Sequence, residues 1–157
     1  MPNENLNNIK NFYEVSTELG TSGQPAADQF EHIAGAGYEY LINLDSAAAV
    51  LEEDKLVVEN GLGYFHIPVI WKEPKQSDLD LFFDVMDMLK GKKVFVHCAA
   101  NARVSAFVYL YRICRLGMDP LKTKKDLNAL WEPDGVWLDF INQAAERHSI
   151  QLPPAAS

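Results

Sequence analysis

The chain has 157 residues, of which 48% are hydrophobic and 23% charged, and its formal net charge is −8. This composition predicts one domain over residues 1–157, with an ordered core over about 10–150, and excludes wholesale disorder. The negative charge argues against binding to nucleic acid or to an anionic membrane. No apolar run approaches the roughly 20 residues of a membrane span. The polar first residues carry no export signal, so we expect a cytoplasmic protein unless a signal was trimmed.

The first half of the chain alternates short apolar segments with helical patterns. The sequence Gly-Thr-Ser-Gly-Gln-Pro at 20–25 is typical of a turn that leads into a helix, with Pro25 near its first position. Ser46 is expected to cap a later helix. In chain order we expect a strand over 12–15, the turn over 20–25, a helix ended by Gly35 and Gly37, a strand over 40–44, a helix over 46–60 and a strand over 64–69.

The second half continues the alternation and contains a short apolar segment typical of a buried central strand. Ser77-Asp78-Leu79-Asp80 resembles a capping box at the start of a helix. In order we expect a helix from Ser77 to about Leu89, a strand over 92–97, a helix over 103–116 stopped by Gly117, a helix from Asp119-Pro120 and a helix over 136–148. Such alternation predicts an α/β domain whose mostly parallel sheet is covered on both faces.

One cysteine lies where such sheets bind ligands, at the carboxyl end of a strand and the start of a helix. Four residues separate Cys98 from Arg103. The helix N-terminus favours a thiolate at Cys98, and the forked guanidinium of Arg103 matches two oxygens of a phosphate-like group. Together they indicate nucleophilic catalysis on a tetrahedral oxyanion. Cys114 lies in an apolar run and is expected to be a small buried hydrophobe.

The segment from His97 through Arg103 resembles the signature loop of the cysteine-dependent protein tyrosine and dual-specificity phosphatases. The chain resembles more closely a bacterial branch of these proteins that occurs alone or fused to β-lactamase-like hydrolases. The stretches that support the resemblance are residues 21–25, 37–44, 64–69 and 97–106. The resemblance implies a three-layer α/β domain with a four- to five-stranded sheet, as in the dual-specificity phosphatases.

The resemblance also implies a role for each residue of the loop. Cys98 would be the nucleophile that forms a phosphocysteine, and Arg103 would bind the oxygens of the substrate and the transition state. His97 would fix and tune the cysteine, although a buried histidine at a strand end is an equally good interpretation. The amides that would form the oxyanion cradle are those of Ala99, Ala100, Asn101, Ala102 and Arg103.

The loop departs from the common pattern at three points. It has four residues between cysteine and arginine, where most tyrosine phosphatases have five. Asn101 stands where the bacterial branch usually has glycine, and asparagine is among the few other residues that tolerate a positive φ. Val104 replaces the serine or threonine that stabilises the departing thiolate. Hydrolysis of the intermediate is therefore expected to be slow unless Ser105 reaches back.

The general acid is not obvious from the sequence. Trp71 stands near the position at which many dual-specificity phosphatases hold aspartate. Glu73 is the best remaining candidate, although a solvated loop charge is the plainer interpretation of it. Asp78 and Asp80 fit the acidic first turn of a capped helix. Asp134 is an outside candidate or a helix cap.

Two other functions remain open beside a phosphatase. A phosphate-binding module with little turnover would fit the combination of Asn101, Val104 and Trp71. A rhodanese-type sulfurtransferase would fit the short loop and the missing acid, because it forms a persulfide. The expected partner is a phosphorylated substrate or a small oxyanion, with no metal site and no organic cofactor. The substrate and the oligomeric state are not determined by the sequence.

Overall fold

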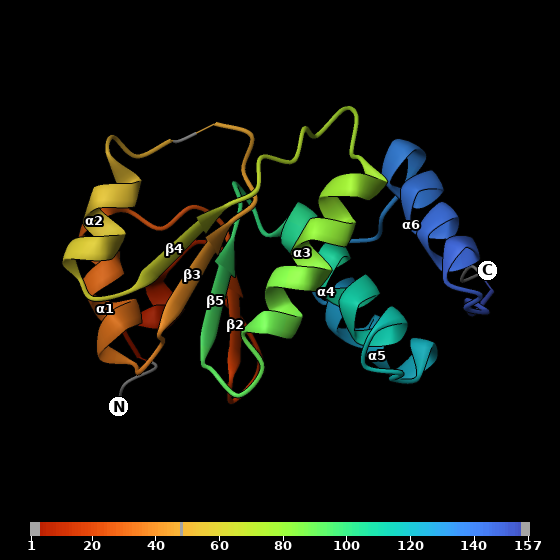
Figure 1. Cartoon of the computed structure of the whole chain (residues 1–157), viewed down its shortest axis with the longest axis horizontal. Helices are drawn as coiled ribbons and strands as arrows, with labels where there is room; N and C mark the ends of the chain where they lie inside the picture. The colour runs from red at the N-terminus through yellow and green to blue at the C-terminus, as the bar shows by residue number, and fades with distance from the viewer. Residues whose placement is uncertain (1–3, 48, 155–157) are drawn as a thin grey trace.

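The structure, a computed structural model, describes residues 4–47 and 49–154 and contains a five-stranded sheet between two layers of helices (Figure 1). The strands are β1 (Tyr13–Ser16), β2 (Leu19–Ser22), β3 (Tyr40–Asn43), β4 (Gly63–His66) and β5 (Val94–His97). Their order in the sheet is β1-β2-β5-β3-β4. The pair β1–β2 is antiparallel and the other three pairs are parallel. The predicted three-layer, mostly parallel α/β fold is confirmed.

Helices α1 and α2 cover one face of the sheet, and the remaining α-helices gather on the other (Figure 1). The α-helices are α1 (Phe30–Gly35), α2 (Glu53–Glu59), α3 (Gln76–Met88), α4 (Ala102–Cys114), α5 (Pro120–Asn128) and α6 (Gly135–Arg147); two short 3-10 helices, η1 (Leu6–Asn8) and η2 (Ala27–Gln29), precede α1. Successive strand residues point to opposite faces, so Leu41 packs with Phe30 of α1 while Ile42 joins the core beneath α4. Within the described residues, no helix is long and apolar enough to cross a membrane.

Helix α4 lies at the centre of the larger core, because every residue from Arg103 to Tyr111 is buried. Phe107 stacks on Phe140 of α6 at a centroid distance of 5.7 Å and packs against Phe82 of α3 at 5.6 Å. Full burial of one such side chain stabilises a fold by about 1.5–3 kcal/mol. The surrounding helices therefore fix the position of α4, and with it the loop that precedes α4.

The expected turn over residues 20–25 is wrong in its first part, because residues 19–22 form strand β2 between β1 and β5, and only residues 23–26 lead toward helix η2. Glycine at position 20 indicates close packing here rather than a turn. A Cβ atom on Gly20 would collide with the ring and hydroxyl of Tyr38. Glycine within a strand marks such a close approach, and the aromatic side chain of Tyr38 supplies the packing that glycine lacks.

Three expected boundaries are also wrong. Helix α2 begins only at Glu53, so Ser46 caps no helix, and Glu52 before α2 has a φ of 54°. Helix α3 begins at Gln76 without a side-chain cap, so the expected capping box from Ser77 does not form. Strand β4 ends at His66 rather than near residue 69. By contrast, the Asp119 carboxylate does cap α5 by accepting a hydrogen bond from the backbone N–H of Lys122.

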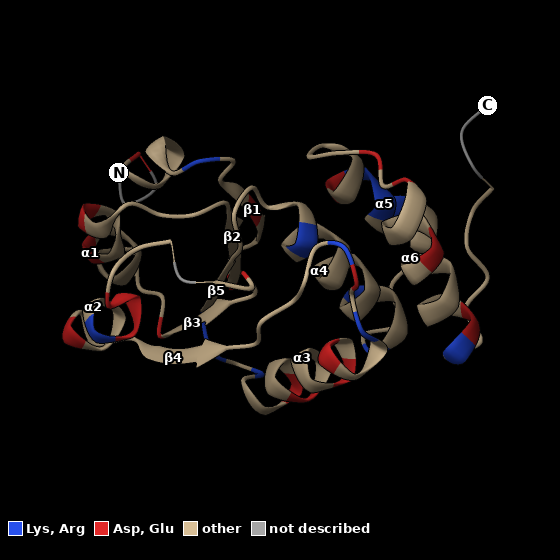
Figure 2. Cartoon of the chain, turned by 90° about the horizontal axis from the view of Figure 1, so that it is seen from above, with Lys and Arg blue, Asp and Glu red and all other residues tan. Residues whose placement is uncertain are grey.

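The parallel arrangement brings the carboxyl ends of β2, β3, β4 and β5 to one edge of the sheet. Figure 2 looks onto this edge, with α1 and α2 on one side and α3 to α6 on the other. Four connecting segments meet there, namely residues 23–26, residues 44–47 with 49–52, residues 67–75 and residues 98–101. All of the predicted site residues lie on or beside these segments and the start of α4.

Candidate functional site

The backbone of the loop from Cys98 to Arg103 is anchored by its carbonyl groups. The carbonyl oxygen of Ala99 accepts a hydrogen bond from the backbone N–H of Gln24 at 3.0 Å. The carbonyl oxygen of Ala100 accepts one from Nδ2 of Asn11 at 2.9 Å. In a trans peptide the N–H and the C=O point in opposite directions, and no peptide bond between described residues is cis. The N–H groups of Ala100 and Asn101, which belong to the same two peptides, therefore point away from these anchors.

The segment after β2 packs directly against this loop. The N–H of Gly23 donates to the carbonyl oxygen of Lys10 at 2.7 Å, and the N–H of Cys98 donates to the carbonyl oxygen of Ser22 at 3.3 Å. A Cβ atom on Gly23 would lie 2.6 Å from the carbonyl oxygen of Ala99. Only glycine permits an approach this close, which explains why glycine directly follows β2.

Asn101 occupies the left-handed position before α4, with a φ of 68°. Its side chain is fully buried, and Nδ2 donates to the carbonyl oxygen of Asn11 at 2.9 Å and to Oγ1 of Thr21 at 3.0 Å. The backbone conformation agrees with the expectation that asparagine replaces glycine here. The side chain turns toward the β1–β2 side and ties the loop to the sheet.

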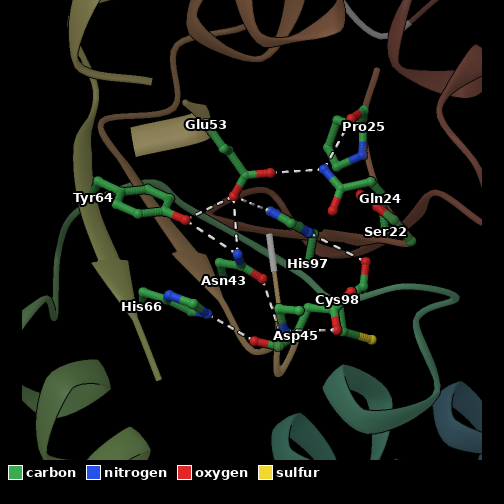
Figure 3. Close-up of polar contacts among 12 residues, drawn as sticks. Ser22, Gln24, Pro25, Asn43, Asp45, Glu53, Tyr64, His66, His97 and Cys98 are labelled. Carbon is green, nitrogen blue, oxygen red and sulfur yellow. Dashed lines mark hydrogen bonds and ion pairs between the residues drawn. The ribbon is translucent and has the colours of Figure 1, made fainter. Parts of the chain in front are cut away.

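The two residues of the expected chemistry lie at the two ends of the loop. Cys98 is only 1% exposed, and its sulfur points away from the polar residues behind it (Figure 3). Arg103 is 7% exposed and lies in the first turn of α4. Its Nη1 donates to the carbonyl oxygen of Val69 at 2.8 Å, and its Nη2 donates to Oδ1 of Asp45 at 3.2 Å. These contacts fix the plane of the guanidinium group.

Asp45, which follows β3, is held in place from three sides. Its backbone N–H donates to Oδ1 of Asn43 at 2.8 Å, and its carbonyl oxygen lies 2.7 Å from Nε2 of His66. Its carboxylate binds Arg103 across the loop edge. Asp45 therefore links the ends of β3 and β4 to the start of α4.

Behind the loop, His97 contacts an acidic residue that the sequence did not indicate. Nε2 of His97 lies 3.0 Å from Oε2 of Glu53, and Nδ1 lies 3.2 Å from the carbonyl oxygen of Cys98. Both side chains are buried, and that of Glu53 is only 1% exposed. The ring of His97 thus spans the space between the carboxylate and the loop (Figure 3).

The Glu53 carboxylate receives hydrogen bonds from four side chains. We call Glu53 and these four donors the rear cluster, which consists of Gln24, Asn43, Glu53, Tyr64 and His97. Oε1 accepts from Nε2 of Gln24 at 2.7 Å. Oε2 accepts from Nδ2 of Asn43 at 3.0 Å, from the Tyr64 hydroxyl at 2.8 Å and from His97. Burial by itself raises the pKa of Glu53, but the hydrogen bond and charge of His97, with the bonds from Gln24 and Tyr64, lower it overall. Glu53 is therefore held as a carboxylate.

Ser105 is the second residue after Arg103, and its hydroxyl both donates and accepts a hydrogen bond. Its hydroxyl donates to the carbonyl oxygen of Ala102 at 2.9 Å and accepts from Nε1 of Trp131 at 2.9 Å. Val104, beside it, is buried in the main core. The hydroxyl of Ser105 is thus committed to the start of α4 and to the 129–134 connection.

The loop that carries Trp71 and Glu73 follows β4 and is exposed. Trp71 is 44% exposed, and its ring lies 5.5 Å from those of Trp131 and Trp137. Glu73 lines a surface hollow of about 240 Å³ together with Val136 and other residues of α6. Among the hydrogen bonds of the described residues, none joins the Glu73 side chain to the loop from residue 98 to 103.

The other acidic candidates lie apart from the loop. Asp78 is in the first turn of α3, where burial raises the pKa of its carboxyl group. Asp80 forms an ion pair with Arg147 of α6 at 2.9 Å. Asp134 stands at the start of α6 without a side-chain capping bond. The structure therefore brings Cys98, Arg103 and His97 together but leaves the carboxylates of the sequence-based list outside.

Three residues at the site escaped the sequence analysis: Asn43, Asp45 and Glu53. Glu53 is hidden in the acidic run from 52 to 54, which is typical of a solvated helix face. The available signal was Asn43, because a buried strand of apolar residues seldom holds an amide unless the amide has a fixed partner. Asp45 directly follows the strand that contains Asn43, at the edge where ligands bind.

Comparison with known proteins bears on the fold and the family. No protein-family model matches the sequence. The crystal structure of a "putative phosphatase (DUF442)" from Shewanella putrefaciens CN-32 superposes with a TM-score of 0.83 and 34% sequence identity, over 93% of this chain and 98% of that one. The core catalytic domain of the PP-IP phosphatase SIW14 from S. cerevisiae superposes with a TM-score of 0.71 at 12% identity, over 90% and 94% of the chains, and shares the fold.

A curated relative is the β-lactamase hydrolase-like protein of Xylella fastidiosa (strain 9a5c), which is 27% identical over 146 residues. The match includes 89% of this chain but only 33% of the relative, so the chain spans about a third of that protein's length. This agrees with a branch that also occurs fused to β-lactamase-like hydrolases. With the identity and coverage shared with the Shewanella protein, the chain belongs to the DUF442 family, whose members have the fold of the cysteine-dependent tyrosine and dual-specificity phosphatases.

Proposed function

We propose that this protein is a cysteine-dependent phosphatase that hydrolyses a phosphate monoester through a phosphocysteine intermediate on Cys98. The observation that carries the proposal is the loop itself. Its carbonyls at Ala99 and Ala100 are tied to neighbouring segments, so the backbone that leads from Cys98 to the N-terminus of α4 is fixed. Backbone N–H groups at a helix N-terminus and the helix dipole stabilise an oxyanion.

Arg103 supports the same function because it is fixed and still has free donors. A guanidinium group carries five N–H donors, and the bonds to Val69 and Asp45 use two of them. The remaining donors can bind two oxygens of a phosphoryl group in a forked geometry. Asp45 would then orient the arginine before the substrate binds, which reduces the cost of ordering it.

The proposed reaction has two steps. The Cys98 thiolate attacks phosphorus, so that an S–P bond forms while the P–O bond to the leaving group breaks, and the leaving oxygen takes up a proton. Water then attacks the phosphocysteine, the S–P bond breaks, and the products are inorganic phosphate and the thiolate. We propose Glu73 as the proton donor of the first step with a modest contribution, since its side chain lies on the exposed 67–75 loop.

A phosphate-binding module with little turnover is the second candidate, and Ser105 is the observation that favours it. The hydroxyl that would assist departure of the Cys98 thiolate already bonds to Ala102 and Trp131. With that assistance lacking, the second step would be slow and the phosphocysteine would accumulate. The two candidates thus differ in the rate of the second step while sharing the same oxyanion site.

The test is an assay with an activated aryl phosphate, comparing the parent with Cys98→Ser and with Cys114→Ser as the matched control. We expect loss of turnover in Cys98→Ser and parental turnover in Cys114→Ser. A parent that forms the adduct but releases no phosphate beyond one equivalent would support the binding module. Formation of a persulfide from thiosulfate, without any phospho-adduct, would instead indicate a sulfurtransferase.

A further inference from the structure

We infer that Glu53 is a positioning residue for the nucleophile: it holds His97 as a cation behind the loop, and this cation favours the thiolate of Cys98. The inference rests on the proposed function only in taking Cys98 as the reactive nucleophile. It concerns a buried carboxylate on α2 whose hydrogen bonds, among the described residues, go to His97 and three other side chains rather than to the Cys98–Arg103 loop, and which acts through the imidazole ring.

The rear cluster is built from five segments that are distant in the sequence. Glu53 comes from α2, Asn43 from β3, Tyr64 from β4, His97 from β5 and Gln24 from the segment after β2. Figure 3 shows the four donors converging on the carboxylate. A carboxylate with only 1% exposure and four hydrogen bonds is satisfied as an anion. The protein therefore maintains a buried negative charge directly behind its proposed nucleophilic loop.

A buried charge of this kind requires a compensating one, and His97 is the group in position. Both of its ring nitrogens face oxygen atoms, Oε2 of Glu53 on one side and the carbonyl oxygen of Cys98 on the other. A proton on each nitrogen lets both donate, whereas a neutral ring leaves one contact without a donor. The pair then carries no net charge, which reduces the cost of burying the carboxylate.

The orientation of this pair determines its effect on the loop. The ring of His97 lies between the Glu53 carboxylate and Cys98, so the positive end of the pair faces the loop and the negative end faces away (Figure 3). Contact with the Cys98 carbonyl also fixes the peptide whose N–H belongs to Ala99. That amide is the first donor of the cradle, so the pair orients the cradle as well as favouring negative charge at Cys98.

The other groups around the pair leave its charge unmodified near neutral pH. On β4 the Tyr64 hydroxyl is neutral there, because burial raises the pKa of that tyrosine well above its ordinary value. On α1 the nearest ring is Phe30, at 6.5 Å from His97. Asn43 and Gln24 are uncharged, and the Asp45–Arg103 pair is already joined. Asp54, next to Glu53 on α2, is exposed and serves as a control.

The test measures the rate at which iodoacetamide alkylates Cys98 as a function of pH, in the parent, Glu53→Gln and Asp54→Asn. The reagent is neutral, so the profile reports thiolate formation and needs no phosphatase turnover. We expect Glu53→Gln to move the half-maximal pH upward by about one unit, the shift typical of losing one nearby opposite charge. Asp54→Asn should leave the profile where it is in the parent.

Two results would overturn the inference: an unchanged profile in Glu53→Gln, or a downward shift, which would mean that Glu53 merely repels the thiolate. Labelling of Cys114 in the same samples reports unfolding, since that thiol is half-buried at the far end of α4. If the single variant Glu53→Gln does not fold, the double variant Glu53→Gln/His97→Gln replaces it. The double variant removes both charges of the pair together and is the milder change. Its profile should also move upward, and a parental profile would overturn the inference. Absence of phosphatase activity in a parent that shows these shifts would reject the proposed function alone.

Discussion

The two sides of the Cys98–Arg103 loop differ in how they are built. Behind the loop, the carboxylate of the rear cluster is buried and has four hydrogen-bond donors. On the opposite side, the 67–75 loop exposes Ile70 and Trp71. Among the hydrogen bonds of the described residues, none joins the side chain of Glu73 to the Cys98–Arg103 loop. In the proposed reaction, fixed groups behind the loop would prepare the nucleophile and the anion site, while the leaving group would face an exposed aromatic surface.

This difference indicates which step of the proposed reaction the protein supports best. Fixed donors and charges act on the attacking sulfur and on the transferred phosphoryl oxygens, because such groups require no reorganisation during the reaction. A leaving group that is a poor base needs little help from the front. We therefore expect attack at phosphorus to be supported strongly and protonation of the leaving group weakly.

The largest expected effect compares the two cysteines. Burial raises the pKa of Cys114 to about 11, so only about one thiol in 10⁴ is ionised at pH 7. Cys98 lies at a helix N-terminus beside Arg103, which favours its thiolate. Iodoacetate at pH 7 should label Cys98 at least 100-fold faster, as read by mass spectrometry of the two peptides. Preferential labelling of Cys114 would contradict the assignment of Cys98 as the reactive cysteine.

Next in size is the contribution of Glu53 to stability. Glu53→Gln leaves His97 without its buried partner, and loss of one member of a buried pair typically costs about 3–5 kcal/mol. The folded-state pKa of Glu53 is below its ordinary value of 4.5, so its stabilisation is present above about pH 4.5 and is lost as the pH falls through the folded value. Urea unfolding at pH 7 and at pH 4 should show a smaller difference between parent and variant at pH 4. An equal difference at both pH values would show that the charge of Glu53 is not what stabilises.

A smaller effect is expected at Arg103. Forked, charge-assisted contacts are worth about 1.5–3 kcal/mol, so Arg103→Ala should weaken phosphate binding at least tenfold. Arg103→Lys should recover little, because an ammonium group cannot make both contacts. Calorimetric titration with inorganic phosphate gives the affinities, and Arg115→Ala at the exposed end of α4 is the matched control. Parental affinity in Arg103→Ala would remove the arginine from the oxyanion site.

The smallest effect is expected on the front side. An acid in position contributes about 10²–10⁴ in rate for a poor leaving group, but Glu73 lies on an exposed loop, so we expect only a few-fold change. Glu73→Gln should slow phosphotyrosine hydrolysis more than hydrolysis of an activated aryl ester. The measurement is the dependence of rate on leaving-group pKa in parent and variant. Equal slopes would take Glu73 out of the mechanism and sharpen the contrast between the two sides.

Local signals in the sequence were sufficient to place the Cys98–Arg103 segment between a buried strand and a helix. Cys98 and Arg103 stand between a short apolar strand and a buried helix, and this context depends on residues close in the chain. Asn101 was expected to take a positive φ from its residue type, and it does. The α/β layers followed from the alternation of apolar periods, as the five-stranded sheet confirms.

What the sequence missed depends on contacts between distant residues. The sequence predicts a turn where β2 lies because Gly20 suits a turn locally, whereas Tyr38 packs onto Gly20 in the folded protein. Glu53 belongs to an acidic run and becomes a buried carboxylate only because Gln24, Asn43, Tyr64 and His97 converge on it. No periodicity in the sequence contains this information, since the five residues come from five separate segments.

The central claim is that Cys98 is a nucleophile that receives a phosphoryl group, and trapping the intermediate tests it most directly. The parent would be mixed with an activated aryl phosphate, quenched in acid within seconds and analysed by mass spectrometry of the peptide that contains Cys98. The account predicts a phosphoryl adduct on Cys98 that is absent in Cys98→Ser and retained in Cys114→Ser. Release of the aryl product by the parent without an adduct on Cys98, or with the adduct on another residue, would contradict it.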